Sequence, residues 1–267
     1  MPAIFAHYVF GREALPRMDA RALPIVRSHM PFYKLGLQGP DFYFFDQLKR
    51  LQGKHLSYIG TMLHNHSCVY LLERLEHVGA RRADSEELAY MLGLIGHFAL
   101  DSTCHPHIDS WVKELDYDHN LIETEFDRML LEREGERARR FPLGSVIKSD
   151  KRTRLKVGTM YKDFSLAEDV AGLWHDFAFI KNLIRTPSDA QYRAYTKLLS
   201  MVGADALGGV LMGERSEIAP TTNLRLMPLF GQAQDVYAKL STNFMDYVRE
   251  GKRLDDYFER DFETLPE

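Results

Sequence analysis

The sequence is poor in cysteine, in net charge and in long apolar runs. Its 267 residues include only two cysteines, too few for the disulfide framework of a small secreted domain. The 34 basic and 38 acidic residues leave a net charge of −4, which provides no overall attraction to nucleic acid or to an anionic membrane. There is no run of about 18 apolar residues, the length that a transmembrane helix needs. The N-terminal segment lacks the basic region of a secretory signal, so we expect a cytoplasmic protein.

The composition is otherwise that of a globular protein, with 45% hydrophobic and 27% charged residues. A chain of this length can bury a sizeable core. Apolar residues recur at helical spacing, and almost no stretch alternates as a strand does. We therefore predict an all-α fold in which residues 1–267 form a single multi-helix domain without repeats or linkers. The expected helices cover residues 19–29, 55–79, 85–100, 119–134, 165–185, 188–202, 229–250 and 254–264, and residues 135–163 and 203–228 are expected to be irregular.

Metal-binding side chains are concentrated between His97 and His107. His97 and Asp101 are four residues apart, so on a helix they lie on one face, about one turn from each other. Pro106 is expected to break that helix, which would place His105 and His107 on a turn that folds back over the helix end. Imidazoles and a carboxylate that converge at a helix terminus suit a divalent transition metal, zinc above all. The alternative is that these histidines are hydrogen-bonded core residues.

The same four-residue spacing occurs again at the start of the helix expected over residues 119–134. His119 and Glu123 would supply a nitrogen and an oxygen ligand from one face of that helix. Two such histidine–carboxylate pairs are typical of a multinuclear metal site between helices. Asp127 lies on the same face and could support the site indirectly, by contacting one of the metal ligands.

Four single residues are weaker candidates. Asp41 follows the turn Gly39-Pro40 and is either a ligand or the N-cap of a helix. His64 and His66 are two residues apart, so on a helix at most one of them faces a shared site. Cys104 is either a soft ligand or a small buried thiol.

In its order of motifs the chain resembles the zinc-dependent phospholipase C family, which is related to the single-strand-specific zinc nucleases. The resemblance covers residues 3–130 and implies an all-helical fold that holds three zinc ions in a cleft. Residues 140–267 would be additional helices of unassigned role. The residues that carry it are His7, Gly39-Pro40-Asp41, a histidine near position 64, His97-x3-Asp101-x5-His107 and His119-x3-Glu123.

The resemblance also implies a role for each of these residues. Asp41 would be the general base on the attacking water, and His66 and His105 are the alternatives to His64 and His107. Family members bind the third zinc through an N-terminal Trp, but this chain begins Met-Pro and has no Trp before Trp111, so two or three zinc ions are expected. The implied zinc ligands are Asp41, His64 and His97, with Asp101 bridging to a neighbouring ion; His107, His119 and Glu123 for a second ion; and His7 with Asp101 for a third.

The expected activity is hydrolysis of a phosphoester by water that a zinc cluster activates. The substrate would be a phospholipid, with transient contact to a membrane surface, or a small phosphate ester; nucleic acid is the less favoured substrate. One alternative is an HD-type phosphohydrolase that uses His175 and Asp176. Another is a non-catalytic helical protein with a structural or vestigial metal site. A carboxylate-bridged di-iron bundle would need Glu-x-x-His motifs, and the sequence has none.

Overall fold

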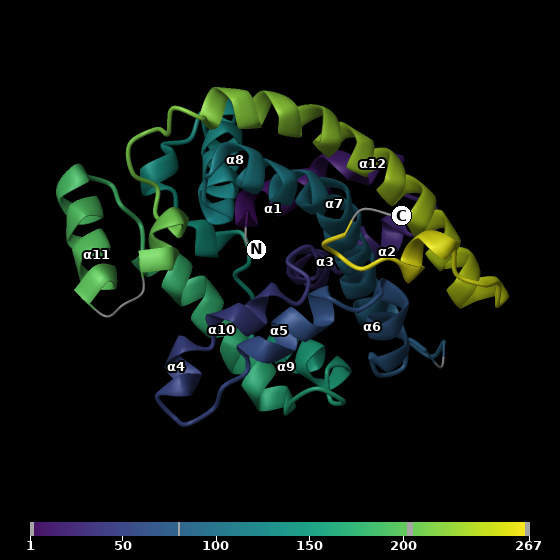
Figure 1. Ribbon diagram of the computed structural model, residues 1–267. Coiled ribbons are helices and arrows are strands. Elements are labelled where there is room, and N and C mark those ends of the chain that lie inside the picture. The colour runs from purple at the N-terminus through teal and green to yellow at the C-terminus, as the bar shows by residue number, and fades with distance from the viewer. Residues whose placement is uncertain (1–2, 80, 202–204, 265–267) are drawn as a thin grey trace.

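A 31-residue helix, α7 (Ser85–Leu115), runs through the middle of the molecule (Figure 1). The structure, a computed structural model, describes residues 3–79, 81–201 and 205–264. Within these ranges the chain forms helices and no strand, as the sequence predicts. The other α-helices are α1 (Ile4–Ala14), α2 (Leu23–Ser28), α3 (Met30–Gly36), α4 (Gln47–Arg50), α5 (Ser57–His64), α6 (Cys68–Arg74), α8 (His119–Arg133), α9 (Lys151–Met160), α10 (Ala167–Leu183), α11 (Asp189–Met201) and α12 (Ala219–Glu250).

Helix α7 is buried on all sides over most of its length. Its first turn is fixed by a capping box, in which the Asp84 carboxylate accepts the N–H of Glu87 and the Glu87 carboxylate accepts the N–H of Asp84. Every residue from Glu87 to Pro106 is buried. A helix that is apolar or buried around its whole circumference is a core helix rather than a surface one. The rest of the chain therefore packs around α7.

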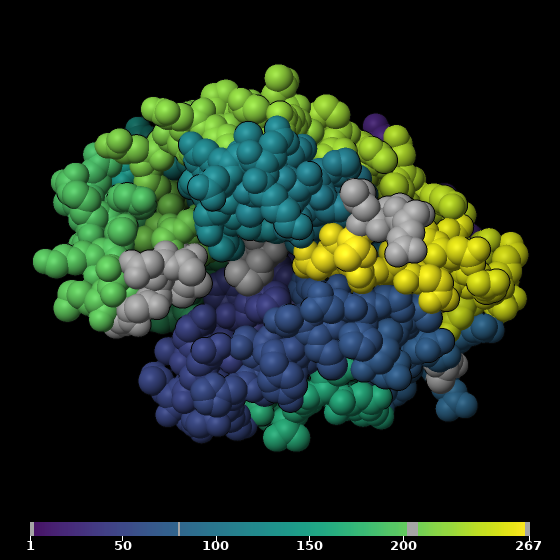
Figure 2. Space-filling model, in the orientation of Figure 1, coloured from purple at the N-terminus to yellow at the C-terminus, as the bar shows by residue number. Residues whose placement is uncertain are grey.

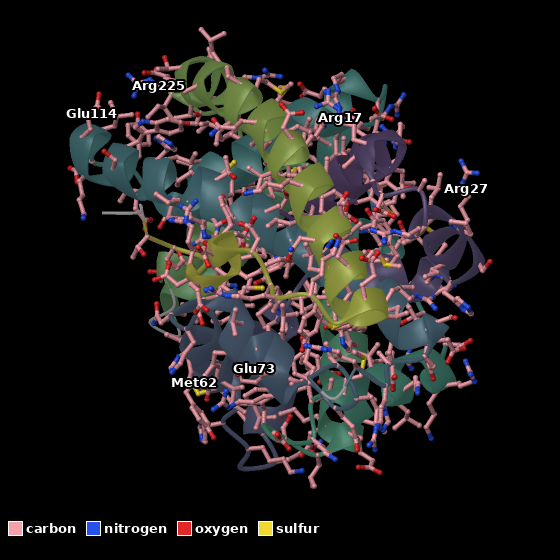
Figure 3. The ribbon with its side chains drawn as sticks, turned by 90° about the vertical axis from the view of Figure 1, so that its right-hand side faces the viewer. Arg17, Arg27, Met62, Glu73, Glu114 and Arg225 are labelled. Atoms are coloured by element: carbon pink, nitrogen blue, oxygen red, sulfur yellow. The ribbon has the colours of Figure 1, made fainter. Side chains whose placement is uncertain are left out.

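Helices α3 and α12 make the most extensive contacts with α7. The α3 contact is a close backbone approach, because a Cβ atom at Gly93 would lie 2.2 Å from the carbonyl oxygen of Tyr33. A Cβ atom at Gly36 would lie 2.0 Å from the carbonyl oxygen of Tyr90. Only glycine fits at either position. Helix α12 packs along α7 as well, and the hydroxyl of Tyr237 on α12 donates to the carbonyl of Leu92 at 3.0 Å. Figure 3 shows α12 in front of α7 from a second direction.

The prediction that Pro106 ends the central helix is wrong. Helix α7 continues through Pro106 to Leu115. A proline inside a helix leaves the carbonyl of the fourth preceding residue without its N–H donor. That carbonyl belongs to Ser102, and it accepts a hydrogen bond of 3.1 Å from the guanidinium of Arg260 near the C-terminus. A contact distant in sequence therefore compensates for the local defect.

The later helices follow the sequence pattern more closely. Helices α8, α10 and α11 confirm the predictions over 119–134, 165–185 and 188–202, with residue 202 outside the described ranges. Helix α12 contains the expected segment 229–250 but begins ten residues earlier than predicted, at Ala219. The expected helix over 254–264 is only a 3-10 turn, η6 (Asp256–Glu259).

Three other expectations change. The segment 19–29 is divided between a turn and the short helix α2. The segment 55–79 is broken into α5 and α6, because Ser67 begins a new helix by accepting the N–H of Tyr70. Residues 151–160, expected to be irregular, form α9, whose first turn is capped by Asp150.

The buried apolar side chains form one contiguous cluster that draws on both halves of the chain. This supports our proposal that the chain is a single domain. Among the described residues, no helix combines the length and the apolar character needed to span a membrane.

Candidate metal centre

Asp101, in the middle of α7, is surrounded by four histidines. Its carboxylate oxygens lie 3.1 Å from His97 Nε2, 3.2 Å from His7 Nε2, 3.6 Å from His105 Nε2 and 4.0 Å from His64 Nε2. All five side chains are buried. The histidines come from three helices, so the cluster is assembled by the fold rather than by one motif.

Helix α1 is held in place by Asp127 of α8. The Asp127 carboxylate accepts the N–H groups of Phe5 and Ala6 at 3.1 and 2.7 Å, which caps the first turn of α1 from another helix. His7 directly follows Ala6 in this first turn, and its Nε2 lies 3.2 Å from Asp101 Oδ1. Asp127 thus positions a predicted ligand through the backbone.

The turn before Asp41 brings this carboxylate against His97. Gly39 has a φ of +50°, and a Cβ atom there would lie 2.1 Å from Cδ2 of His97. The chain then enters the 3-10 turn η2 (Asp41–Phe45), of which the fully buried Asp41 is the first residue. Its Oδ1 lies 3.1 Å from His64 Nε2 and 4.0 Å from His97 Nε2.

A second set of donors lies between α7 and α8. His105 Nε2 is 3.2 Å from Glu123 Oε1, and His119 Nε2 is 3.6 Å from the same oxygen. The side chain of His119 is 25% exposed, so this set lies nearer to solvent than the set around Asp101. The pair His119 and Glu123 is therefore arranged on one helix face, as its spacing predicts.

Three of the imidazoles have their Nδ1 atoms tied to other groups. His64 Nδ1 is 2.8 Å from the carbonyl of Gly60, His105 Nδ1 is 3.0 Å from Glu263 and His119 Nδ1 is 2.9 Å from Asp109. A partner at Nδ1 fixes the ring and leaves Nε2 as the donor atom, which is the usual arrangement of a metal-bound histidine. Sequence analysis did not identify Asp109 or Glu263, since neither lies at a regular spacing from its histidine.

Two histidines in the predicted stretches lie outside the cluster. Because α7 continues past Pro106, His105 is one helical turn from Asp101, whereas the ring of His107 packs against Trp111 at 6.2 Å between centroids. His66 is exposed, and its ring packs at a tilt against that of Tyr70, with 4.2 Å between centroids. The structure thus brings the predicted His64 to the cluster rather than its alternative His66, and it brings His105 there in place of the predicted His107.

Two further candidates can be placed. Cys104 is buried in a small cavity beside Asp101, and burial raises the pKa of its thiol, so it is protonated. This matches the interpretation as a small buried thiol. His175 is exposed on α10, with its ring against Phe179, and belongs to no group of converging metal donors among the described residues.

The donor atoms meet the requirements of zinc. Within the described residues, seven buried polar atoms of the cluster make no hydrogen bond: His7 Nδ1, Asp41 Oδ1 and Oδ2, His64 Nε2, both ring nitrogens of His97, and Asp101 Oδ2. Asp41 Oδ1 and His64 Nε2, and likewise Asp101 Oδ2 and His97 Nε2, only face each other as ion pairs at 3.1 Å. Leaving such groups unsatisfied costs about 1–3 kcal/mol each, so a partner is expected. The facing imidazole Nε2 and carboxylate oxygen atoms of the cluster include four pairs that are 3.1–3.6 Å apart. These separations match the spacing of about 3.4 Å between ligands that lie about 2.1 Å from a tetrahedral ion.

Metal binding needs ionised carboxylates and neutral imidazoles, and the two central carboxylates and His97 already have these forms. Burial opposes ionisation of Asp41, but its contacts with His64 and His97 lower the pKa to about 2. Burial also opposes ionisation of Asp101, but the nearby His105, His97 and His7 hold its pKa well below the usual value. Burial lowers the pKa of His97 to about 3 and keeps this ring neutral. At His64, His105 and His119 burial lowers the pKa, but the neighbouring carboxylates raise it above the usual value, so binding of metal there competes with a proton.

Three groups of donors could each hold a metal ion. In each group the donor atoms lie within 4.8 Å of one another, and His97 belongs to two groups. The groups are His7, His97 and Asp101; Asp41, His64 and His97; and His105, His119 and Glu123.

Comparison with known proteins agrees with this geometry. The family model of zinc-dependent phospholipase C matches residues 6–184, which is more than half of the chain and contains all the residues of the three donor groups. No curated protein and no solved structure matches the chain. The helical fold agrees with that family, as the resemblance of the motifs predicts. The chain therefore belongs to the zinc-dependent phospholipase C family.

Proposed function

We propose that this protein is a zinc-dependent phosphoester hydrolase that uses a cluster of two or three zinc ions. The observation that carries the proposal is the convergence of three donor groups around Asp101, with buried donor atoms that make no hydrogen bond. Such a cluster suits phosphate esters, because two metal ions a few ångströms apart can stabilise both the attacking and the leaving oxygen. Family membership implies a phosphoester substrate.

In this proposal Asp101 links the ions. Its two oxygens face different histidines: Oδ1 faces His7 and His105, and Oδ2 faces His97 and His64. A bridging carboxylate with this orientation would fix the spacing of the cluster. The ligands that we propose are His7, Asp41, His64, His97, Asp101, His105, His119 and Glu123, which differ from the set predicted from the sequence by His105 in place of His107.

Zinc held by these residues would supply positive charge that neutralises phosphoryl oxygens and lowers the pKa of a bound water toward 7. Asp41 is the proposed general base. Its lowered pKa keeps it ionised at neutral pH, as a base must be, but also makes it a weak base. It can therefore accept a proton only from a water that has already been made acidic.

The rigid surroundings keep these groups in place. The rings of His64 and His119 are oriented through Nδ1 by Gly60 and Asp109. Because the carbonyl of Gly60 belongs to the same helix as His64, that ring has little freedom to turn. Solvent reaches the cluster most easily at His119, and we propose that the substrate approaches from this side. We propose that the substrate is a phospholipid presented at a membrane surface or a small phosphate ester, and that the protein acts in the cytoplasm.

The test combines zinc content with hydrolysis. Apo-protein reloaded with zinc would be assayed with bis(4-nitrophenyl) phosphate as a phosphodiester and 4-nitrophenyl phosphate as a phosphomonoester. We expect two or three zinc ions per chain and hydrolysis of at least one compound, with both lost in Asp101→Asn. His64→Ala and His66→Ala form a matched pair, in which only the first should lose zinc and activity. A fully zinc-loaded protein that hydrolyses neither compound would refute the proposal and favour the structural metal site.

A further inference from the structure

The last described segment of the chain crosses the metal centre. Helix α12 ends at Glu250, and Gly251, with a φ of +71°, turns the chain back toward α7. We call residues 255–264 the C-terminal strap. Figures 1 and 3 show the strap between α7 and the region of α6, and in Figure 2 it separates the surface of α7 and α8 from that of residues 40–75.

Backbone hydrogen bonds tie the strap to the connection between α5 and α6. The N–H of Cys68 donates to the carbonyl of Arg260 at 3.0 Å, and the N–H of Phe262 donates to the carbonyl of His64 at 3.1 Å. The second bond joins the strap directly to a proposed zinc ligand. The position of the strap is therefore fixed relative to the cluster.

The strap also binds the turn of α7 that contains Pro106. Arg260 donates to the carbonyl of Ser102, which the proline leaves without a helical donor. Phe262 is fully buried, and its ring centroid lies 5.3 Å from that of His64 and 5.7 Å from that of His97. This ring covers two imidazoles with an apolar surface.

Glu263 contacts a proposed zinc ligand on the side opposite to the cluster. One of its carboxylate oxygens lies 3.0 Å from Nδ1 of His105, whose Nε2 faces Glu123 and Asp101 at 3.2 and 3.6 Å. The carboxylate thus accepts a hydrogen bond from one ring nitrogen while the other nitrogen points to the metal position. Carboxylate–histidine–zinc chains of this kind set the tautomer and the orientation of the ring and make it a stronger ligand.

We propose that Glu263 is a positioning residue of the metal centre, which orients His105 for zinc, and that the C-terminal strap completes the centre from outside the region that the family model matches. The family match ends at residue 184, so it assigns no role to this segment. The proposal depends on zinc binding at His105, which is part of the proposed function. It does not depend on which phosphoester is hydrolysed.

The experiment compares Glu263→Ala and Glu263→Gln with Glu259→Ala. Glu259 lies in the same strap but is exposed, so it is a matched control for loss of one carboxylate. Each apo-protein would be titrated with zinc in competition with a chromogenic chelator, which gives the number of ions and the affinity of each. Thermal unfolding of the apo-proteins would show whether the fold itself is affected.

We expect Glu263→Ala to bind one zinc ion 10–100-fold more weakly than wild type, which is the usual effect of removing a carboxylate behind a metal-bound histidine. The other ions should bind as in wild type, and Glu259→Ala should behave as wild type throughout. Glu263→Gln keeps an oxygen acceptor and loses the charge, so its affinity should lie between those of the alanine variant and wild type. If Glu263→Ala does not fold, the zinc affinity of Glu263→Gln alone tests the proposal.

Cobalt supplies a signature that a purely structural role would not give. With Co²⁺ in place of zinc, the visible absorption of the bound ion should differ between wild type and the Glu263 variants, because the orientation and basicity of one ligand change. Wild-type zinc affinity and an unchanged cobalt spectrum in Glu263→Ala would overturn the proposal. So would an equal weakening of all ions together with a destabilised apo-protein. Hydrolysis is measured separately: a wild type that binds zinc without hydrolysing anything would refute the proposed function, while the zinc titration would still decide the role of Glu263.

Discussion

His105 and His107 provide the sharpest test of the proposed centre, because they are two residues apart and the structure gives them opposite roles. His105 is 2% exposed and lies 3.0–3.6 Å from the carboxylates of Asp101, Glu123 and Glu263. His107 faces away from these groups and packs on Trp111. Replacing each by alanine removes the same imidazole from the same helical turn. The matched pair therefore separates loss of a ligand from general damage to α7.

The magnitude follows from the contacts. A residue that only supports a metal-bound histidine is worth about 10–100-fold in affinity, so removing the histidine itself should weaken its zinc ion by more than about 100-fold. Without zinc, the variant leaves two buried carboxylates near each other with their shared cationic partner gone, and its apo-form should also lose stability. His107→Ala loses one aromatic contact, worth about 0.5–1.5 kcal/mol, and its zinc affinity should stay within about twofold of wild type.

The assay is zinc content per chain by plasma mass spectrometry after dialysis against buffers of defined free zinc concentration. His105→Ala should contain one ion fewer than wild type wherever free zinc is limiting. The opposite pattern, with zinc lost from His107→Ala and kept in His105→Ala, would refute the reasoning. It would mean that the metal-bound chain breaks its helix at Pro106, as the local sequence rule suggests.

Three further predictions concern the supports of the site. Asp127→Ala removes the acceptor of two buried N–H groups of α1. It should lower the free energy of unfolding in urea by about 2–6 kcal/mol. An unchanged midpoint of urea unfolding would show that other contacts hold α1. Gly39→Ala forces a Cβ atom against the ring of His97 and should reduce both the stability and the zinc content. Gly53 also has a positive φ but has open space around it. Gly53→Ala should therefore lower the free energy of unfolding by only about 1–2 kcal/mol and leave the zinc content unchanged. In the zinc-free protein, burial opposes protonation of His119, but Glu123 and Asp109 raise its pKa to about 8. Zinc must then displace a proton at neutral pH, so affinity should increase as the pH rises from 6 to 8. Equal affinities at pH 6 and pH 8 in the competition titration would contradict this.

The sequence alone could predict only those parts of the site that depend on residues close together in the chain. The pairs His97/Asp101 and His119/Glu123 were recognisable because ligands four residues apart need only a helix to bring them together. The helix around residues 151–160 was missed although a signal existed: Asp150 is an N-cap, and the buried residues that follow are spaced as on one helix face. The apolar fraction of that segment is low, and this concealed the pattern.

The choice between His105 and His107 could not be made locally. It depends on whether α7 survives Pro106, and that depends on the guanidinium of Arg260 at the carbonyl of Ser102. The support of His105 by Glu263 joins residues 158 positions apart, a distance at which no periodicity gives a signal. Tertiary contacts of this kind override a local propensity, and a single sequence does not reveal them.

The strap has a consequence for the order in which the protein matures. A chain leaves the ribosome from its N-terminus, and its early helices begin to pack while later ones are still being made. Most of the proposed ligands could therefore gather as soon as α8 has emerged, long before Glu263 exists. Until the strap arrives, the carbonyl of Ser102 has no donor and His105 has no carboxylate behind it. A nascent chain would hold its first metal ions weakly, and tight retention would begin only once the strap has been made and has packed against α7.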